Sequence, residues 1–259
     1  GYVYPTIGYG AFVVICLVSA LLALIRLESA VLLVLGELFI GSQGGAMLSF
    51  GAQGDEGGIS IRLGLFLTVV SIWLATRLTL LLSRNMPHRT AGWAWLAKMR
   101  QHRLLWPYCA LLLLFFGAVV LGIVRGYSFA DVFFDANGYI FFIFFPIFVT
   151  AFDRIEIYKK MFAVLLAAAT VSAVKALLVL YIFSHRLLPI AKLTYAWVRD
   201  TRVGEITRMV GDFYRVFFQS HLFVVVAFFF TLLFLLFRKN GLWGLASLDK
   251  NSVSQKYVG

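Results

Sequence analysis

The sequence predicts an all-α membrane protein, a polytopic bundle of about seven transmembrane helices. Of its 259 residues, 61% are hydrophobic and only 14% are charged, and the mean hydropathy is +0.90. Because soluble globular domains carry about 25% charged residues, this composition excludes an ordinary soluble domain. The apolar residues also form separate stretches close to the roughly 20 residues that cross a bilayer. We therefore expect residues 1–259 to form a single transmembrane domain.

The apolar stretches predict the helices in order. They cover residues 9–25, 29–40, 61–83, 106–124, 139–152, 161–184 and 220–237. The second stretch is short for a span, and a glycine-rich loop at 41–58 separates it from the third. Pro146 lies inside the fifth stretch, where a missing backbone N–H predicts a kink.

Lysine and arginine in the short connections predict the orientation. Residues 84–103, residues 153–160 and the C-terminal tail are rich in these cations, which are typical of cytoplasmic loops. An alternating path places all three on that side, with the N-terminus outside and the C-terminus inside. The opposite side then holds residues 41–58, 125–137 and 185–219.

Residues 185–219, the Arg-rich segment, break this orientation rule. Six cations occur there, Arg186, Lys192, Arg199, Arg202, Arg208 and Arg215, against three acids, Asp200, Glu205 and Asp212. Spacings of three and four from Arg202 to Gln219 predict an amphipathic helix at the outer interface. One interpretation is a solvated face whose charges pair with one another. The other is a site for a lipid-linked phosphate or diphosphate, since arginine holds phosphate oxygens bidentately.

Two ionisable residues lie within expected spans. Lys175 is in the sixth stretch with Ser172 one turn before it, and either has a function or extends its amine to the interface. Glu37 either pairs with Lys175 or Arg62 or acts as a carboxylate in a cavity. Arg62 and Arg125 lie at helix ends, where they anchor headgroups or line one outward cavity together with the Arg-rich segment.

The sequence offers few candidates for catalysis or metal binding. Glu37 and His221 are the candidate catalytic residues, and His221 is a candidate for proton transfer. No histidine, cysteine and carboxylate group has metal-ligand spacing, so we expect no metal site. The basic residues are scattered over several loops, which argues against nucleic-acid binding.

Three runs resemble a known family. GELFIGSQGGAMLSF (36–50), GISIRLGLFLTVVSIWL (58–74) and RVGEITRMVGDFYRVFFQSHLFVVVAFFF (202–230) are similar to the N-terminal half of O-antigen ligase and O-antigen polymerase-like integral membrane proteins. The family's large periplasmic loop, with its important histidine, normally lies further toward the C-terminus. We therefore expect this chain to be the N-terminal part of a longer protein, a split subunit or a degenerate relative.

The resemblance implies a glycosyltransferase at the outer face of the bacterial inner membrane. It would transfer or polymerise a glycan carried on undecaprenyl diphosphate, with no nucleotide sugar or metal cofactor. Arginines would bind the diphosphate, and a general base would activate the acceptor. By position, the candidate diphosphate ligands are Arg202, Arg208 and Arg215, with Arg125, Arg186 and Lys175.

Two other functions stay open on the sequence. The first is a transporter or flippase for an anionic lipid or solute, which would use Lys175 and Glu37 inside the membrane. The second is a non-catalytic subunit of a larger membrane complex. The expected partners are the lipid bilayer, the polyprenyl-diphosphate-linked glycan and other membrane subunits.

Overall fold

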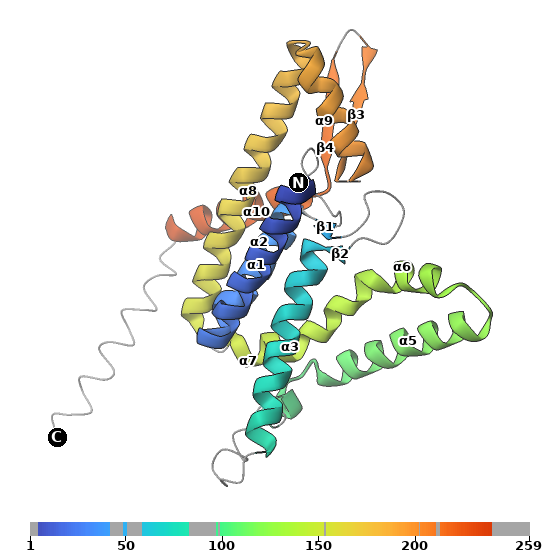
Figure 1. Ribbon diagram of the computed structural model, residues 1–259. Helices are drawn as coiled ribbons and strands as arrows, with labels where there is room; N and C mark the ends of the chain where they lie inside the picture. The colour runs from blue at the N-terminus through green and yellow to red at the C-terminus, as the bar shows by residue number, and fades with distance from the viewer. Residues whose placement is uncertain are drawn as a thin grey trace, which may run out of the picture.

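The computed structural model describes residues 5–41, 49–50, 59–82, 97, 99–152, 154–201, 203–210 and 213–239, and these are mostly helical (Figure 1). The elements are α1 (Pro5–Ile25), α2 (Leu27–Gly41), β1 (Ser49–Phe50), β2 (Ile59–Ser60), α3 (Ile61–Leu82), α5 (Leu105–Val124), α6 (Phe129–Ile140), η1 (Phe141–Phe144), α7 (Phe145–Ala151), α8 (Ile155–Ser184), α9 (Leu188–Asp200), β3 (Gly204–Arg208), β4 (Tyr214–Phe218) and α10 (His221–Lys239). Two short β-hairpins thus interrupt the expected all-α fold.

A bundle of α1, α2, α3 and α8 forms the body of the protein (Figure 1). Helix α2 packs against the other three, and its Val31 lies in a core with Phe66 of α3 and Ile147 of α7. Helix α8 is longer than its neighbours and extends past them (Figure 1). The pairing of β1 with β2 returns the chain from the end of α2 to the start of α3.

Four described helices are long and apolar enough to cross a membrane: Thr6–Ile25, Ile61–Leu82, Leu105–Val124 and Ile155–Ser184. The expectation of about seven spans is not confirmed. Helix α2 (Leu27–Gly41) covers only about 22 Å, which is less than the roughly 30 Å of the hydrocarbon core. The described apolar part of α10, His221–Phe237, is also short, and α10 leaves α8 sideways in Figure 1.

The fifth expected helix is broken into α6, η1 and α7. Pro146 lies in the first turn of α7, where its missing N–H interrupts no helical hydrogen bond. The proline therefore starts a helix instead of kinking one.

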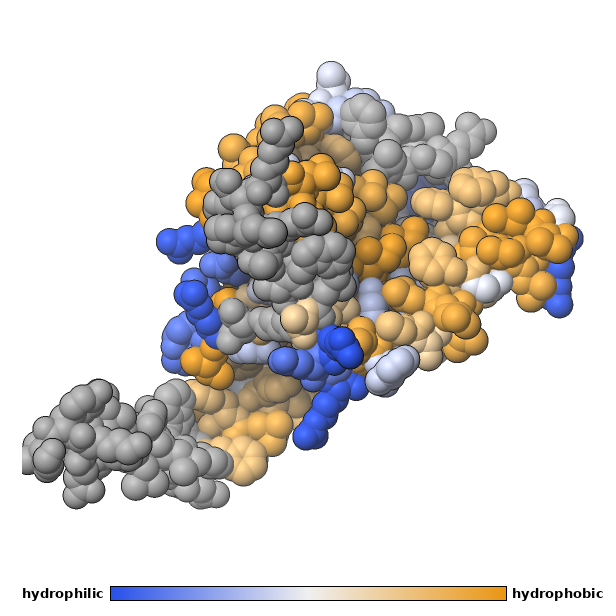
Figure 2. Space-filling view, turned by 90° about the horizontal axis from the view of Figure 1, so that it is seen from below, coloured by the Kyte–Doolittle hydropathy of each residue, from blue (hydrophilic) through white to orange (hydrophobic). Residues whose placement is uncertain are grey.

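Helices α5 and α6 form an antiparallel helical pair that extends sideways from the bundle (Figure 1). No residue of α5 is buried, although its side chains are almost all apolar. Seen from below, apolar residues cover much of the described surface (Figure 2). Apolar surface on this scale indicates contact with lipid, so the chain is a membrane protein.

The end of α8 leads into a small unit made of α9, β3 and β4, which we call the hairpin unit. Helix α8 ends where Leu187 N–H donates to Ile182 O and Arg186 N–H donates to Phe183 O. Arg186 has a positive φ, the left-handed conformation that this type of helix end requires. The chain then runs back along α8, and the buried Val198 and Phe218 pack against that helix.

The prediction of one amphipathic helix over residues 202–219 is wrong, because residues 204–208 and 214–218 are antiparallel strands. In β4, Tyr214, Val216 and Phe218 face the hairpin unit's core, while Arg215 and Phe217 are exposed. This alternation with period two is typical of a half-buried strand. The amphipathic helix of the segment is instead α9, which lies along α8.

Candidate functional site

Two charged residues form a buried ion pair between α2 and α3. Arg62 Nε donates to Glu37 Oε2 at 3.1 Å, and the two side chains are only 9% and 16% exposed, respectively. Ser60 Oγ accepts a hydrogen bond from Leu63 N–H and so caps α3, which places Arg62 in its first turn. Of the alternatives left open by the sequence, Arg62 is therefore the partner of Glu37.

Nη2 of the Arg62 guanidinium faces the last turn of α2. Arg62 Nη2 is buried and has no hydrogen-bond partner among the described residues. A Cβ built on Gly41 would lie 3.6 Å from this nitrogen and 2.5 Å from Glu37 Oε1. Glycine at position 41 therefore leaves the room that the ion pair occupies.

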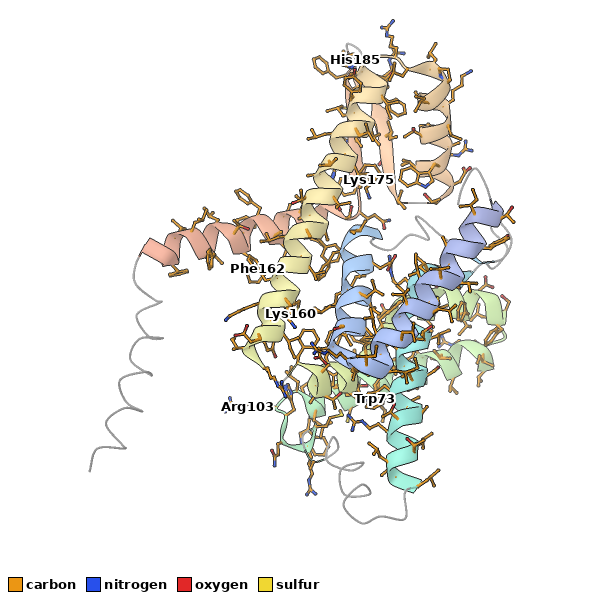
Figure 3. The ribbon with its side chains drawn as sticks, turned by 60° about the vertical axis from the view of Figure 1, so that its left-hand side comes forward. Trp73, Arg103, Lys160, Phe162, Lys175 and His185 are labelled. Carbon is orange, nitrogen blue, oxygen red and sulfur yellow. The ribbon has the colours of Figure 1, made fainter. Side chains whose placement is uncertain are left out.

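Lys175 approaches the same turn of α2 from α8. Its Nζ donates to Ile40 O at 3.3 Å and lies 4.6 Å from the centre of the Phe218 ring. Figure 3 shows Lys175 partway along α8, below the end of the helix marked by His185. The ammonium thus joins α8, the end of α2 and the last residue of β4.

Two cations consequently lie at the last residues of α2, with Lys175 on Ile40 O and Arg62 beside Gly41. The carboxyl end of a helix carries partial negative charge, which favours cations there. Glu37 neutralises Arg62, whereas Lys175 has no carboxylate partner among the described residues. Glu37, Arg62 and Lys175 together carry one net positive charge that no described residue compensates, and we call them the α2-end cluster.

His221 is the first residue of α10 and follows the end of β4. Phe218 N–H donates to His221 Nδ1 at 3.5 Å, and the imidazole meets the Phe218 ring edge to face. The buried hydroxyls of Ser172 and Ser220 have no hydrogen-bond partner in the described part of the chain. His221 and Lys175 thus lie on the same phenylalanine, and Glu37 lies at α2 with Arg62.

The described cations of the Arg-rich segment are exposed. Arg215 pairs with Glu205 across the hairpin at 3.6 Å, and Arg199 pairs with Asp200 at 2.8 Å. These contacts are what the self-paired interpretation expects. Arg208 ends β3 opposite Tyr214, and Arg202 and Asp212 lie outside the described residues.

Arg125 is separate from the other candidates. It follows α5 directly, at the turn into α6, and this turn lies away from the hairpin unit in Figure 1. The structure therefore does not gather all the cations suggested by the sequence into one site. It brings together Lys175 with Arg62, a residue that the sequence offered as a headgroup anchor.

Sequence reasoning missed two contributors to the α2-end cluster. Gly41 follows Glu37 by four residues, and this spacing puts both on one helix face, so a signal was present. Phe218 gave no signal, because a phenylalanine in an aromatic strand is ordinary.

The described residues contain no group of three histidine, cysteine or acidic side chains able to hold a metal ion. The chain matches no family model, no curated protein and no solved structure. Any functional assignment therefore depends on the chemistry of the site itself.

Proposed function

We propose that the protein binds a polyprenyl-diphosphate-linked glycan at the outer face of a bacterial inner membrane and takes part in its transfer or polymerisation. The observation that carries this proposal is Arg62, a buried arginine whose Nη2 has no partner among the described residues. Lys175 donates to Ile40 O in the same last turn of α2. The α2-end cluster would hold the diphosphate.

Each charged residue has a separate role in this proposal. Glu37 accepts from Arg62 Nε and so fixes the guanidinium plane. Nη2, which has no partner among the described residues, keeps its N–H donors for a phosphate oxygen. Lys175 adds a point charge near the same place. Fixed cations of this kind stabilise the negative charge that develops on a departing diphosphate. The exposed Arg186, Lys192 and Arg208 attract the anionic lipid over a longer range.

The histidine candidate receives a different role. Because Phe218 N–H donates to Nδ1 of His221, the neutral ring carries its proton on Nε2 and has no lone pair there for a base. We therefore propose that His221 holds the end of β4 through Phe218 and does not act as a base. Glu37 orients Arg62.

Outside the Arg-rich segment, the distribution of cations supports the proposed orientation. Figure 3 places Arg103 and Lys160 toward the end of the molecule opposite to His185. The positive-inside rule assigns the end that carries Arg103 and Lys160 to the cytoplasm. The ligand would then reach the α2-end cluster from the outside.

The test is binding of undecaprenyl diphosphate to the purified full chain in detergent. Arg62→Lys keeps a cation for Glu37 but removes the guanidinium edge, and we expect it to weaken binding about tenfold or more, since hydrogen bonds to charged groups contribute about 1.5–3 kcal/mol. Arg125→Gln removes an exposed cation at the α5–α6 turn and serves as the control. Equal affinity for wild type and Arg62→Lys would contradict the proposal.

A second measurement separates transfer from transport. Release of polyprenyl diphosphate from a labelled glycan-lipid in detergent, where no gradient exists, would support transfer. Movement of the intact lipid across sealed vesicles without bond cleavage would instead support a flippase.

A further inference from the structure

The Lys175 ammonium links the hairpin unit to the end of α2. It donates to Ile40 O and lies over the Phe218 ring, which is fully buried at 0% exposure. A Cβ on Gly204, across the hairpin, would lie 2.8 Å from Phe218 Cδ1. Gly204 therefore leaves the room that the ring occupies. Because Lys175 contacts this ring, a displacement of β4 would break that contact.

The ammonium still has capacity for an anion. Lysine carries three N–H donors, and the described contacts direct one to Ile40 O and one to the Phe218 ring. The third donor has no partner among the described residues and remains for an oxygen of the proposed ligand. An anion there would hold the ammonium in place and strengthen its existing contacts.

We propose that Lys175 is a positioning residue that couples diphosphate binding at the α2-end cluster to the seating of the hairpin unit. This inference rests on the proposed function for its ligand. The coupling is reciprocal, as any linkage between two equilibria must be. Ligand binding orders β3 and β4, and a firmly seated β4 raises the affinity for the ligand.

Hydrogen exchange of β3 and β4 tests the coupling in the full-length detergent-solubilised chain. Without ligand, we expect Lys175→Met to lower the protection of these strands, because it keeps the apolar stem but loses the ammonium. Lys175→Arg should restore the protection. Val174→Met, at an exposed neighbouring position of α8, is the matched control.

Addition of undecaprenyl diphosphate should raise the protection of β3 and β4 at least about fivefold in wild type and Lys175→Arg, the lower end of typical allosteric coupling. The same addition should not raise the protection of β3 and β4 in Lys175→Met. Inorganic pyrophosphate in a parallel sample shows whether the diphosphate group alone is sufficient or the lipid is needed.

The outcomes distinguish the two proposals. If neither probe binds wild type, the proposed function is wrong and the coupling falls with it. If a probe binds but β3 and β4 keep their protection, or gain it equally in Lys175→Met, only the coupling is wrong. Ligand-free protection that is identical in wild type and Lys175→Met would also overturn it.

Discussion

Removal of one member of the Glu37–Arg62 pair should destabilise the bundle strongly, whereas removal of both should be tolerated. The perturbations are Arg62→Met, Glu37→Met and the double variant. Methionine keeps much of the apolar volume of either side chain, so the change is mainly one of charge. The pair joins α2 to α3 at the end where the diphosphate is proposed to bind, and its loss would be felt by both helices.

The distance and burial set the magnitude. The charged atoms are 3.1 Å apart. At an effective dielectric constant of about 20, Coulomb attraction over that distance is about 5 kcal/mol. Burial of each ion costs several kcal/mol, so the intact pair adds little net stability. A single substitution leaves the other charge buried without compensation and should cost about 3–5 kcal/mol. The double variant should lie within about 1–2 kcal/mol of wild type, because apolar side chains replace both ions.

The assay is reversible unfolding in mixed micelles, analysed as a double-mutant cycle. The expected interaction free energy, the two single losses together minus the loss of the double variant, is about 4 kcal/mol or more. Additive effects, in which the double variant loses the sum of the two single losses, would refute the reasoning and show that the two charges do not depend on each other.

Two further predictions concern backbone positions. A Cβ at Gly41 would lie 2.5 Å from Glu37 Oε1, whereas one at Gly10 would meet open space. Gly41→Ala should therefore cost about 1–3 kcal/mol in the same assay, and Gly10→Ala should not destabilise the protein. Arg186→Gly relieves a left-handed residue with positive φ. It should stabilise the protein by about 0.5–1 kcal/mol, and lower stability would show that the arginine side chain outweighs the backbone strain.

The helices of the bundle could be predicted because each contains one long, mainly apolar run. The expected 61–83 and the observed Ile61–Leu82 of α3 nearly coincide, and α8 extends the expected 161–184 at its start, to Ile155. The number of spans could not be predicted in the same way. Hydropathy does not reveal that the fifth stretch is three short helices or that α10 leaves α8 sideways.

The Arg-rich segment shows why charge spacing alone misleads. Spacings of three and four match one helix face, but the set runs across two strands and the turn between them. The alternation in Tyr214–Phe218, with Val216 between two aromatic residues on the buried face, carried the correct signal. Side-chain burial decided the structure, and the charges followed it.

The site was only partly predictable. Glu37, Arg62 and Lys175 were each noticed as ionisable residues in apolar surroundings. Their grouping depends on how α2, α3 and α8 pack, since Lys175 is far from Ile40 in sequence. A single sequence contains no periodic pattern that encodes this contact.

In the proposed function, the diphosphate binds at the last turn of α2. Photo-crosslinking with a polyprenyl diphosphate that carries a photoreactive group near its phosphates, followed by peptide mapping, tests it most directly. If the diphosphate binds at the α2-end cluster, we expect adducts on the end of α2, the first turn of α3 and α8 around Lys175. Adducts confined to the exposed arginines of β3 and β4, or to the α5–α6 turn, would contradict it.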